Sequence, residues 1–227
     1  MILKTKYICT LLFLSLFSLS SCFEVIEELD VHKSGSGNMT VTLNLSQSKT
    51  KLASVMLLDS INGYKVPSKT QIQRELNEAV TILKKTPGIS AVGHRIDFEN
   101  FIISISYSFE RIDNLNHISK VIYEKLKIKP TGKSLYNFDT GKQLFSRVYT
   151  YAPEAKSAYA KLKDADKEIF NTASYTSIYR FDNMVKQLTN KQAKVSGTKK
   201  AVMLRTSVLD LINGKTNIAN QIQLVNN

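Results

Sequence analysis

Histidines are the residues of this sequence that could most readily bind a metal ion or transfer protons. His32, His94 and His117 stand far apart, with no HExxH motif and no i, i+4 pair, so the sequence predicts no zinc site. His94 is followed by Arg95 and Asp97, and strand alternation places both of them on the face opposite to His94. We therefore expect His94 to be a half-buried strand residue. A hydrolase with a dispersed site, including His94 and Asp97, is the least favoured function.

Nucleophile and phosphate-binding motifs give no better support for catalysis. In Ser34-Gly35-Ser36-Gly37, neither serine has the glycine two positions earlier that a G-x-S-x-G nucleophile elbow requires. The same segment lacks the third glycine of a dinucleotide-binding loop. Glu27 and Glu28 point to opposite faces of a strand, so they cannot act together on one bond. The sequence predicts no catalytic residue, no metal and no cofactor, and we expect the protein not to be an enzyme.

Both cysteines, Cys9 and Cys22, lie in the first tenth of the chain. Two lysines precede an apolar run from Tyr7 to Leu19, which is too short to span a membrane and typical of a signal peptide. The run ends in Leu19-Ser20-Ser21-Cys22, which resembles the lipobox of bacterial lipoprotein precursors. The resemblance implies that residues 1–21 are a signal peptide, cleaved between Ser21 and Cys22. It also implies that Cys22 carries a diacylglyceryl group and, on its new amino group, a further acyl chain such as palmitate. An ordinary secretory signal is the alternative.

The lipobox resemblance also suggests where the protein resides. Two or three acyl chains on Cys22 anchor a protein in effect irreversibly, and no later stretch reaches the roughly 18 apolar residues of a membrane span. Phe23 stands where inner-membrane lipoproteins often carry an aspartate. We therefore expect a lipid-anchored protein of the cell envelope, attached to the outer membrane on either of its faces.

Charge is the most unusual feature of the composition. The 227 residues include 25 lysines and only 6 arginines, and the net charge is +12. Arginine is the better reader of phosphates and bases, and an exported lipoprotein rarely meets nucleic acid, so we expect no nucleic-acid partner. Most of the lysines are expected to form a solvated surface, and anionic lipid headgroups are a possible partner. With 43% apolar and 22% charged residues, the composition excludes collagen-like and wholly disordered chains.

Period-two alternation predicts several antiparallel hairpins. In the first, Phe23, Val25, Leu29 and Val31 share a face on which Glu27 is the exception, and Ser34–Gly37 forms the turn. The remaining strand predictions are 39–45, 92–98, 101–109, 135–138, 144–151, 175–181, 201–205 and 218–224.

Helical spacing of apolar residues predicts helices between these hairpins. They are expected over residues 48–62, from the N-cap Ser68 to Leu83, from Asp113 to Leu126 and from Pro153 to Ile169. Leu58–Gly63 and Leu209–Gly214 are similar in sequence, and we interpret them as two helix ends rather than a duplication. The fold class is thus α+β, a mostly antiparallel sheet of hairpins with helices packed on one face. Residues 22–227 are expected to form a single domain, with a possible subdivision near 130–152.

These patterns leave a non-catalytic function as the main hypothesis. We expect a structural, adaptor or binding role, with a possible protein partner in the envelope. Beyond the lipobox, the first hairpin is similar to that of envelope lipoproteins of unassigned activity that open with G-S-G. The alternative is a carrier of a lipid or other apolar ligand, with a cavity between sheet and helices lined by residues such as Phe101, Ile103, Ile105 and Tyr107.

Overall fold

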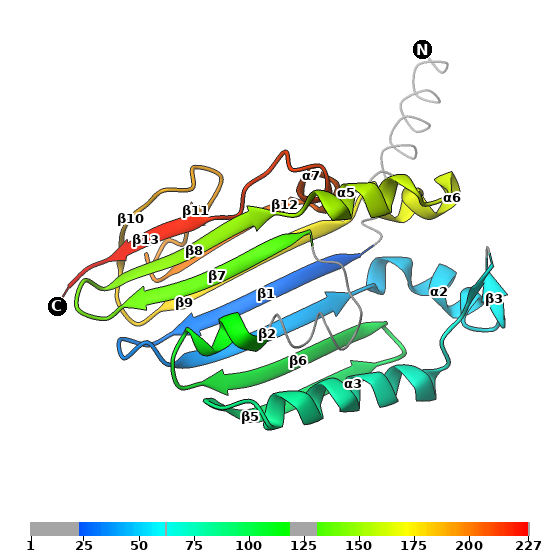
Figure 1. Cartoon of the computed structure of the whole chain (residues 1–227), viewed down its shortest axis with the longest axis horizontal. Helices are drawn as coiled ribbons and strands as arrows, with labels where there is room; N and C mark the ends of the chain where they lie inside the picture. Colours follow the sequence, from blue (N-terminus) through cyan, green and yellow to red (C-terminus); the bar gives the residue numbers. More distant parts are fainter. Residues whose placement is uncertain (1–22, 62, 119–130, 227) are drawn as a thin grey trace, which may run out of the picture.

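The strands of the protein form two packed sheets and one small separate hairpin (Figure 1). The computed structural model describes residues 23–61, 63–118 and 131–226. The strands are β1 (Glu24–Val31), β2 (Gly37–Asn44), β3 (Ser60–Ile61), β4 (Tyr64–Lys65), β5 (Ile89–Asp97), β6 (Ile102–Phe109), β7 (Gly132–Asp139), β8 (Leu144–Tyr151), β9 (Ser174–Phe181), β10 (Val185–Leu188), β11 (Lys194–Val195), β12 (Ala201–Ser207) and β13 (Asn220–Leu224).

The larger sheet has seven strands in the order β11-β12-β9-β1-β2-β6-β5. The hairpins β1–β2 and β5–β6 form as predicted, and β2 pairs with β6 antiparallel. Gly37 begins β2, where an added Cβ would stand 1.8 Å from the carbonyl oxygen of Asp30, so only glycine fits there. The pairing of β1 with β9 is parallel and joins segments 150 residues apart, for example Glu24 with Ser174. The prediction of a mostly antiparallel α+β fold is confirmed.

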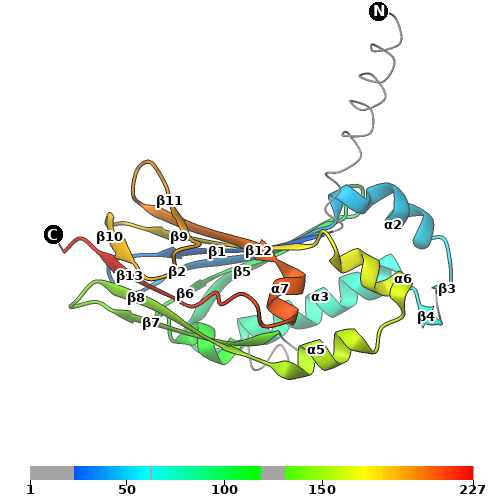
Figure 2. The same cartoon turned by 90° about the horizontal axis from the view of Figure 1, so that it is seen from above.

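A second sheet of four strands, in the order β10-β13-β8-β7, covers one face of the larger sheet (Figure 2). The hydrophobic core lies between the two sheets. Leu29 of β1, Phe145 of β8 and Ile222 of β13 have no exposed surface, and Tyr179 of β9 is 1% exposed. The rings of Phe145 and Tyr179 are tilted against each other with centroids 4.9 Å apart. The two inner faces therefore form one continuous core.

The longer helices lie on the same side of the larger sheet as the four-stranded sheet (Figure 2). The helical segments are η1 (Ser46–Ser48), α2 (Lys49–Val55), α3 (Lys69–Lys84), α5 (Pro153–Ala160), α6 (Asp164–Lys167), η2 (Glu168–Phe170) and α7 (Val208–Ile212). Ser68 caps α3 as predicted, because its side chain accepts a hydrogen bond from the Gln71 backbone N–H. The buried face of α3 includes Leu76, Ala79, Val80 and Leu83.

Two helix predictions are wrong in extent. The helix expected over residues 48–62 ends at Val55, and the chain then forms the β3–β4 hairpin. The helix expected from Pro153 to Ile169 breaks after Ala160, because Lys163 takes an extended conformation before α6. The similar segments also differ from expectation. Leu209–Gly214 forms a helix end with Gly214 at φ +67°, whereas Leu58 lies in the turn before β3.

Other predictions fall wholly or partly outside the described residues. Residues 1–22, which include Ser21 and Cys22, lie outside them. Residues 114–118 are helical, in agreement with the helix expected after Asp113, and the continuation to Leu126 lies outside the description. Within the described parts of the chain, no helix has the length and hydropathy that a membrane crossing requires.

The acidic residues of β1 are distributed over both faces of the larger sheet. Glu28 and Asp30 face outward and pair with Arg180 at 2.5 and 3.3 Å, which raises the pKa of Arg180. Glu24, on the same outer face, lies 3.7 Å from Arg205. Glu27 alone points inward, toward the second sheet, as strand alternation predicts.

Candidate functional site

A cavity of about 310 Å³ lies between the two sheets, next to Glu27. Its lining comes from β1, β2, β6 and β9 of the larger sheet, from β7 and β8 of the smaller sheet, and from α3 and α7. The lining side chains on the larger sheet are there because strand alternation points every second residue to the inner face. The described lining residues are Val25, Glu27, Met39, Val41, Leu83, Ile105, Tyr107, Leu115, Thr131, Gly132, Ser134, Tyr136, Arg147, Tyr149, Tyr175, Leu211 and Ile218.

Much of this lining is apolar. Met39 and Val41 of β2 pair with Tyr107 and Ile105 of β6, so these four side chains stand side by side on the inner face. Met39 and Tyr107 are buried, whereas Val41 keeps 38% of its surface exposed although it points inward. An inward-facing valine with that exposure indicates that packing is incomplete at this place. This part of the cavity can therefore accept further apolar atoms.

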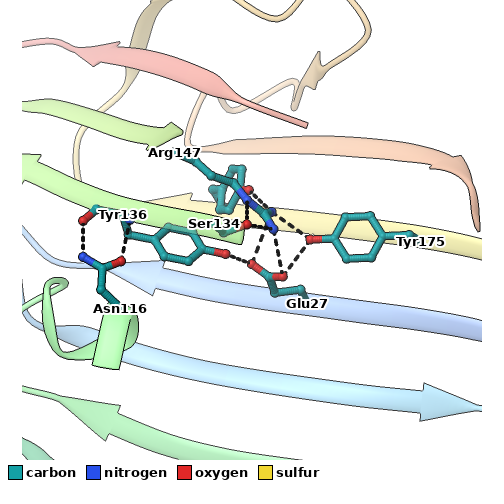
Figure 3. Close-up of polar contacts among 7 residues, drawn as sticks. Glu27, Asn116, Ser134, Tyr136, Arg147 and Tyr175 are labelled. Atoms are coloured by element: carbon teal, nitrogen blue, oxygen red, sulfur yellow. Dashed lines mark hydrogen bonds and ion pairs between the residues drawn. The ribbon is translucent and has the colours of Figure 1, made fainter. Parts of the chain in front are cut away.

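One end of the cavity is polar. The residues that form it are here called the polar cluster: Glu27, Ser134, Tyr136, Arg147, Tyr175 and Tyr179 (Figure 3). Arg147 projects from β8 and is 4% exposed. Its guanidinium makes five hydrogen bonds, two to the Ser134 hydroxyl, one each to Tyr175 and Tyr179, and one to Glu27. A guanidinium has five N–H donors, so Arg147 has no donor left for a ligand.

The Glu27 carboxylate is also fully engaged by its neighbours. One of its oxygens accepts a short hydrogen bond from the Tyr136 hydroxyl, and the other accepts one from Tyr175 at 2.7 Å. The carboxylate lies 3.4 Å from the guanidinium of Arg147, so the two charges compensate each other. Asn116 holds Tyr136 in place, because its side chain bonds to both the backbone N–H and the carbonyl oxygen of Tyr136 (Figure 3).

Burial decides the ionisation of the cluster. Burial raises the pKa of Tyr136, Tyr175 and Tyr179, and the negative charge of Glu27 adds to this, although the positive charge of Arg147 opposes it. Burial, the largest single influence, disfavours the charge on Arg147, but Glu27 and the three tyrosines together outweigh it and raise the pKa of Arg147. The tyrosines are therefore neutral and the arginine charged at any physiological pH.

The cluster is suited to positioning side chains rather than to proton transfer or anion binding. Its ion pair is neutral overall and all donors of Arg147 are bonded within the cluster, so a carboxylate or phosphate would have to displace a bonded partner to reach the guanidinium. The guanidinium also lies over the rings of Tyr136 and Tyr175, with centroid distances of 5.2 and 5.7 Å. A molecule that enters the cavity thus meets apolar side chains and neutral tyrosines.

A second cavity, of about 340 Å³, lies beneath the β3–β4 hairpin. Its lining is almost wholly apolar and includes Leu52, Val55, Met56, Val66, Pro67 and Phe98. A larger hollow runs over the outer side of α3, but exposed polar side chains such as Gln73, Arg74 and Glu78 line it. The sequence predicts that Phe101, Ile103, Ile105 and Tyr107 line one apolar cavity, but they line two. Ile105 and Tyr107 line the inter-sheet cavity, and Phe101 and Ile103 line the second one.

His94 and Asp97, the residues considered for a hydrolase site, do not form a common site. His94 pairs with Ile105 and Asp97 with Ile102, so they face opposite sides of β5, and Asp97 instead accepts hydrogen bonds from Asn100. Bonding to Asn100 lowers the pKa of Asp97. The expectation that His94 is half-buried is wrong, because β5 is the edge strand of its sheet and leaves the ring exposed.

The other two histidines are equally remote from a catalytic arrangement. His32 lies 3.4 Å from Asp182 at the surface, and hydrogen bonding to the Lys33 backbone and to His32 lowers the pKa of Asp182. His117 is exposed. Over the described ranges, no group of three or more His, Cys, Asp or Glu side chains could hold a metal ion.

Sequence reasoning missed Arg147, although a signal for it exists. In β8, Phe145, Arg147 and Tyr149 have the same parity, so a charged residue lies on a face that is otherwise aromatic. In β1, alternation likewise identifies Glu27 as the one charged residue on the inner face. Two inward charges of opposite sign, each on an apolar strand face, favour a buried ion pair, because an isolated buried charge is very costly.

Comparisons with known proteins add little to this geometry. No family model matches the sequence, and no curated protein matches it significantly. Among solved structures, the chain is similar to the folded domain of the Mycobacterium tuberculosis protein LppM, determined by NMR. The TM-score is 0.48 and the identity 8%, over 92% of each chain.

Proposed function

We propose that this protein is a lipid-anchored, non-catalytic protein of the cell envelope whose folded part binds one small apolar molecule between its sheets. The observation that carries this proposal is the inter-sheet cavity, apolar over much of its lining and closed at one end by a neutral polar cluster. Ligand sites of proteins are mostly apolar pockets of about 300–1,000 Å³ with a few fixed polar groups. The cavity of about 310 Å³ is at the lower end of that range.

The polar cluster also indicates the class of ligand. All five donors of Arg147 are used, and its charge is compensated by Glu27. A free carboxylate or phosphate would enter without a cation of its own and would lose its hydration. The ligand we propose is therefore an uncharged chain or ring compound, such as a long-chain alcohol or the acyl part of a neutral lipid.

The anchor in this proposal rests on the sequence. Leu19-Ser20-Ser21-Cys22 supports cleavage before Cys22 and acylation of its thiol, and Phe23 supports attachment to the outer membrane. A carrier held near a bilayer has its apolar ligand close at hand.

Fluorescence titration with N-phenyl-1-naphthylamine, an uncharged apolar probe, tests the proposal. We expect saturable binding of one probe per chain, and displacement by dodecanol at lower concentration than by dodecanoate. Val41→Trp fills the cavity from β2 and should weaken binding at least tenfold. The matched control is Val148→Trp, because Val148 is 54% exposed and lies outside the cavity lining; it should bind as the wild type does.

Two results would contradict this function. Absence of saturable binding would exclude the cavity as a ligand site and favour an adaptor role toward an envelope protein. Equal weakening by Val41→Trp and Val148→Trp would place the bound probe outside the cavity.

A further inference from the structure

Four large apolar side chains are exposed close together between α2 and α3. Leu57 is 87% exposed, Leu58 51%, Tyr64 56% and Ile61 38%, and these four residues are here called the apolar tip. Single exposed apolar residues are common on soluble proteins, but four within eight positions concentrate exposed apolar surface in one short region of the chain, which suits contact with another apolar surface. Leu57 has the largest exposed fraction of the large apolar side chains described.

The tip projects from the body on elements that bury little of their own surface. Helix α2 contains no buried residue, and β3 and β4 pair only with each other among the described strands. Beneath them lies the second apolar cavity, of about 340 Å³. A two-stranded hairpin is marginal on its own in water, so contact of its apolar side chains with another phase would stabilise this region.

The position of the tip indicates what that phase is. β3 and β4 project at the end of the molecule where β1 begins and α2 leaves the sheet (Figures 1 and 2). Glu24 pairs with Asn44, so the start of β1 and the end of β2 lie side by side, immediately before η1 and α2. Cys22 is only two residues before Glu24 in the sequence, and α2 is seven residues or about 10 Å long. Acyl chains on Cys22 would therefore hold a bilayer within reach of the tip.

The charge around the tip suits an anionic bilayer surface. Residues 49–69 contain Lys49, Lys51, Lys65 and Lys69 and a single acid, Asp59, a net charge of +3. All four lysines are exposed. Lysines close to a membrane are attracted to anionic headgroups, and a tyrosine such as Tyr64 is well placed at the boundary between headgroups and acyl chains. A protein partner could match the apolar side chains, but the nearby anchor point favours the bilayer.

We infer that the apolar tip inserts into the headgroup region of the membrane that holds Cys22, as a second contact beside the acyl chains. This inference rests on the lipid anchor of the proposed function and not on the inter-sheet cavity. Insertion would fix the orientation of the sheets relative to the bilayer, since a single acylated residue leaves rotation free. It would also bring the second apolar cavity to the membrane surface.

Fluorescence of single-cysteine variants of the full lipidated chain tests the inference. Leu58→Cys places a thiol at the tip, and Met184→Cys is the matched control, because Met184 is 47% exposed. It immediately precedes β10, which lies at the end of the molecule opposite to β3 (Figure 1). In the processed, acylated chain neither native cysteine is free, so the fluorophore NBD reports one site. In vesicles of phosphatidylcholine with phosphatidylglycerol, nitroxide lipids should quench the label at position 58 at least threefold more than the label at position 184.

The double variant Leu57→Asp/Leu58→Asp supplies a second measurement, because both sites are exposed and the fold should be retained. With the label at Ser60→Cys, it should abolish the lipid quenching seen without the two aspartates. Mass spectrometry of the same sample reports acylation separately. If mass spectrometry detects no acylation, the proposed lipid anchor is wrong. Membrane insertion of the apolar tip would still be supported if the chain binds vesicles and the two aspartates abolish that binding.

Two outcomes overturn the inference. One is equal quenching by nitroxide lipids at positions 58 and 184. The other is a label at position 58 that neither iodide nor nitroxide lipids quench in native envelope membranes. That result would show that a protein, and not the bilayer, covers the tip.

Discussion

Replacing Arg147 with methionine should leave the Glu27 carboxylate buried and charged without its cation. Arg147 is 4% exposed, and its guanidinium lies 3.4 Å from Glu27. Tyr136 and Tyr175 would still donate hydrogen bonds to the carboxylate, so the cost comes mainly from the lost charge pairing. Removing one partner of a buried ion pair costs about 3–5 kcal/mol of unfolding free energy. With a urea slope of about 2 kcal/mol per molar, the midpoint should fall by roughly 1.5–2.5 M.

Urea denaturation followed by far-UV circular dichroism measures this, since the chain has no tryptophan to report folding. Arg111→Met is the matched control. Arg111 pairs with Asp113 at 3.1 Å but is 78% exposed, so its loss should cost less than about 1 kcal/mol. The double variant Glu27→Leu/Arg147→Met removes both charges and should recover much of the stability lost in Arg147→Met.

The reasoning about the polar cluster fails under either of two results. One is a destabilisation by Arg147→Met no larger than that by Arg111→Met. The other is a double variant whose loss of stability equals the sum of the losses from Glu27→Leu and Arg147→Met, because the two side chains would then act independently.

Three further predictions concern a glycine of β7, the cluster tyrosines and the lipid anchor. Gly132→Ala should lower the unfolding free energy by about 1–3 kcal/mol, because its Cβ would stand 2.5 Å from the Tyr149 ring, whereas Gly197→Ala, with nothing within 4 Å, should have little effect in the same urea assay. The cluster tyrosines should not affect stability below pH 10 and should lower it above, since their raised folded-state pKa values let the unfolded state lose protons first. Tyr175→Phe should reduce the slope of unfolding free energy against pH, measured by urea denaturation, by up to about 1.4 kcal/mol per pH unit. Cys22→Ser should abolish incorporation of a clickable fatty acid, and undiminished labelling would end the lipoprotein interpretation.

The local elements of the fold could be predicted from the sequence. The hairpins β1–β2, β5–β6 and β7–β8 each combine alternating side chains with a nearby turn, so all their information is contained within about 20 residues. The prediction of a single helix over residues 48–62 fails because the end of the helix is not encoded in the spacing of its apolar residues. Leu52, Val55 and Met56 have helical spacing, and they lie on the apolar side of α2 and at its C-cap, but the residues after them form a hairpin. Spacing alone does not fix where a helix ends.

The candidate site could be predicted only in part. Strand alternation identifies Glu27 as an inward charge, and the inner-face residues Ile105 and Tyr107 do line the cavity. Their neighbours across the cavity come from β8, which belongs to a different sheet, and no local pattern specifies how two sheets are aligned. The parallel pairing of β1 with β9, which brings Tyr175 next to Glu27, likewise joins distant parts of the chain.

Photo-crosslinking with an uncharged diazirine-bearing long-chain alcohol tests the central claim most directly, since it reports where an apolar ligand resides. We expect adducts on residues that line the inter-sheet cavity, such as Val41, Ile105 and Leu83, and excess dodecanol should suppress them. Adducts confined to the apolar tip around Leu57, or unaffected by excess dodecanol, would contradict a ligand site between the sheets.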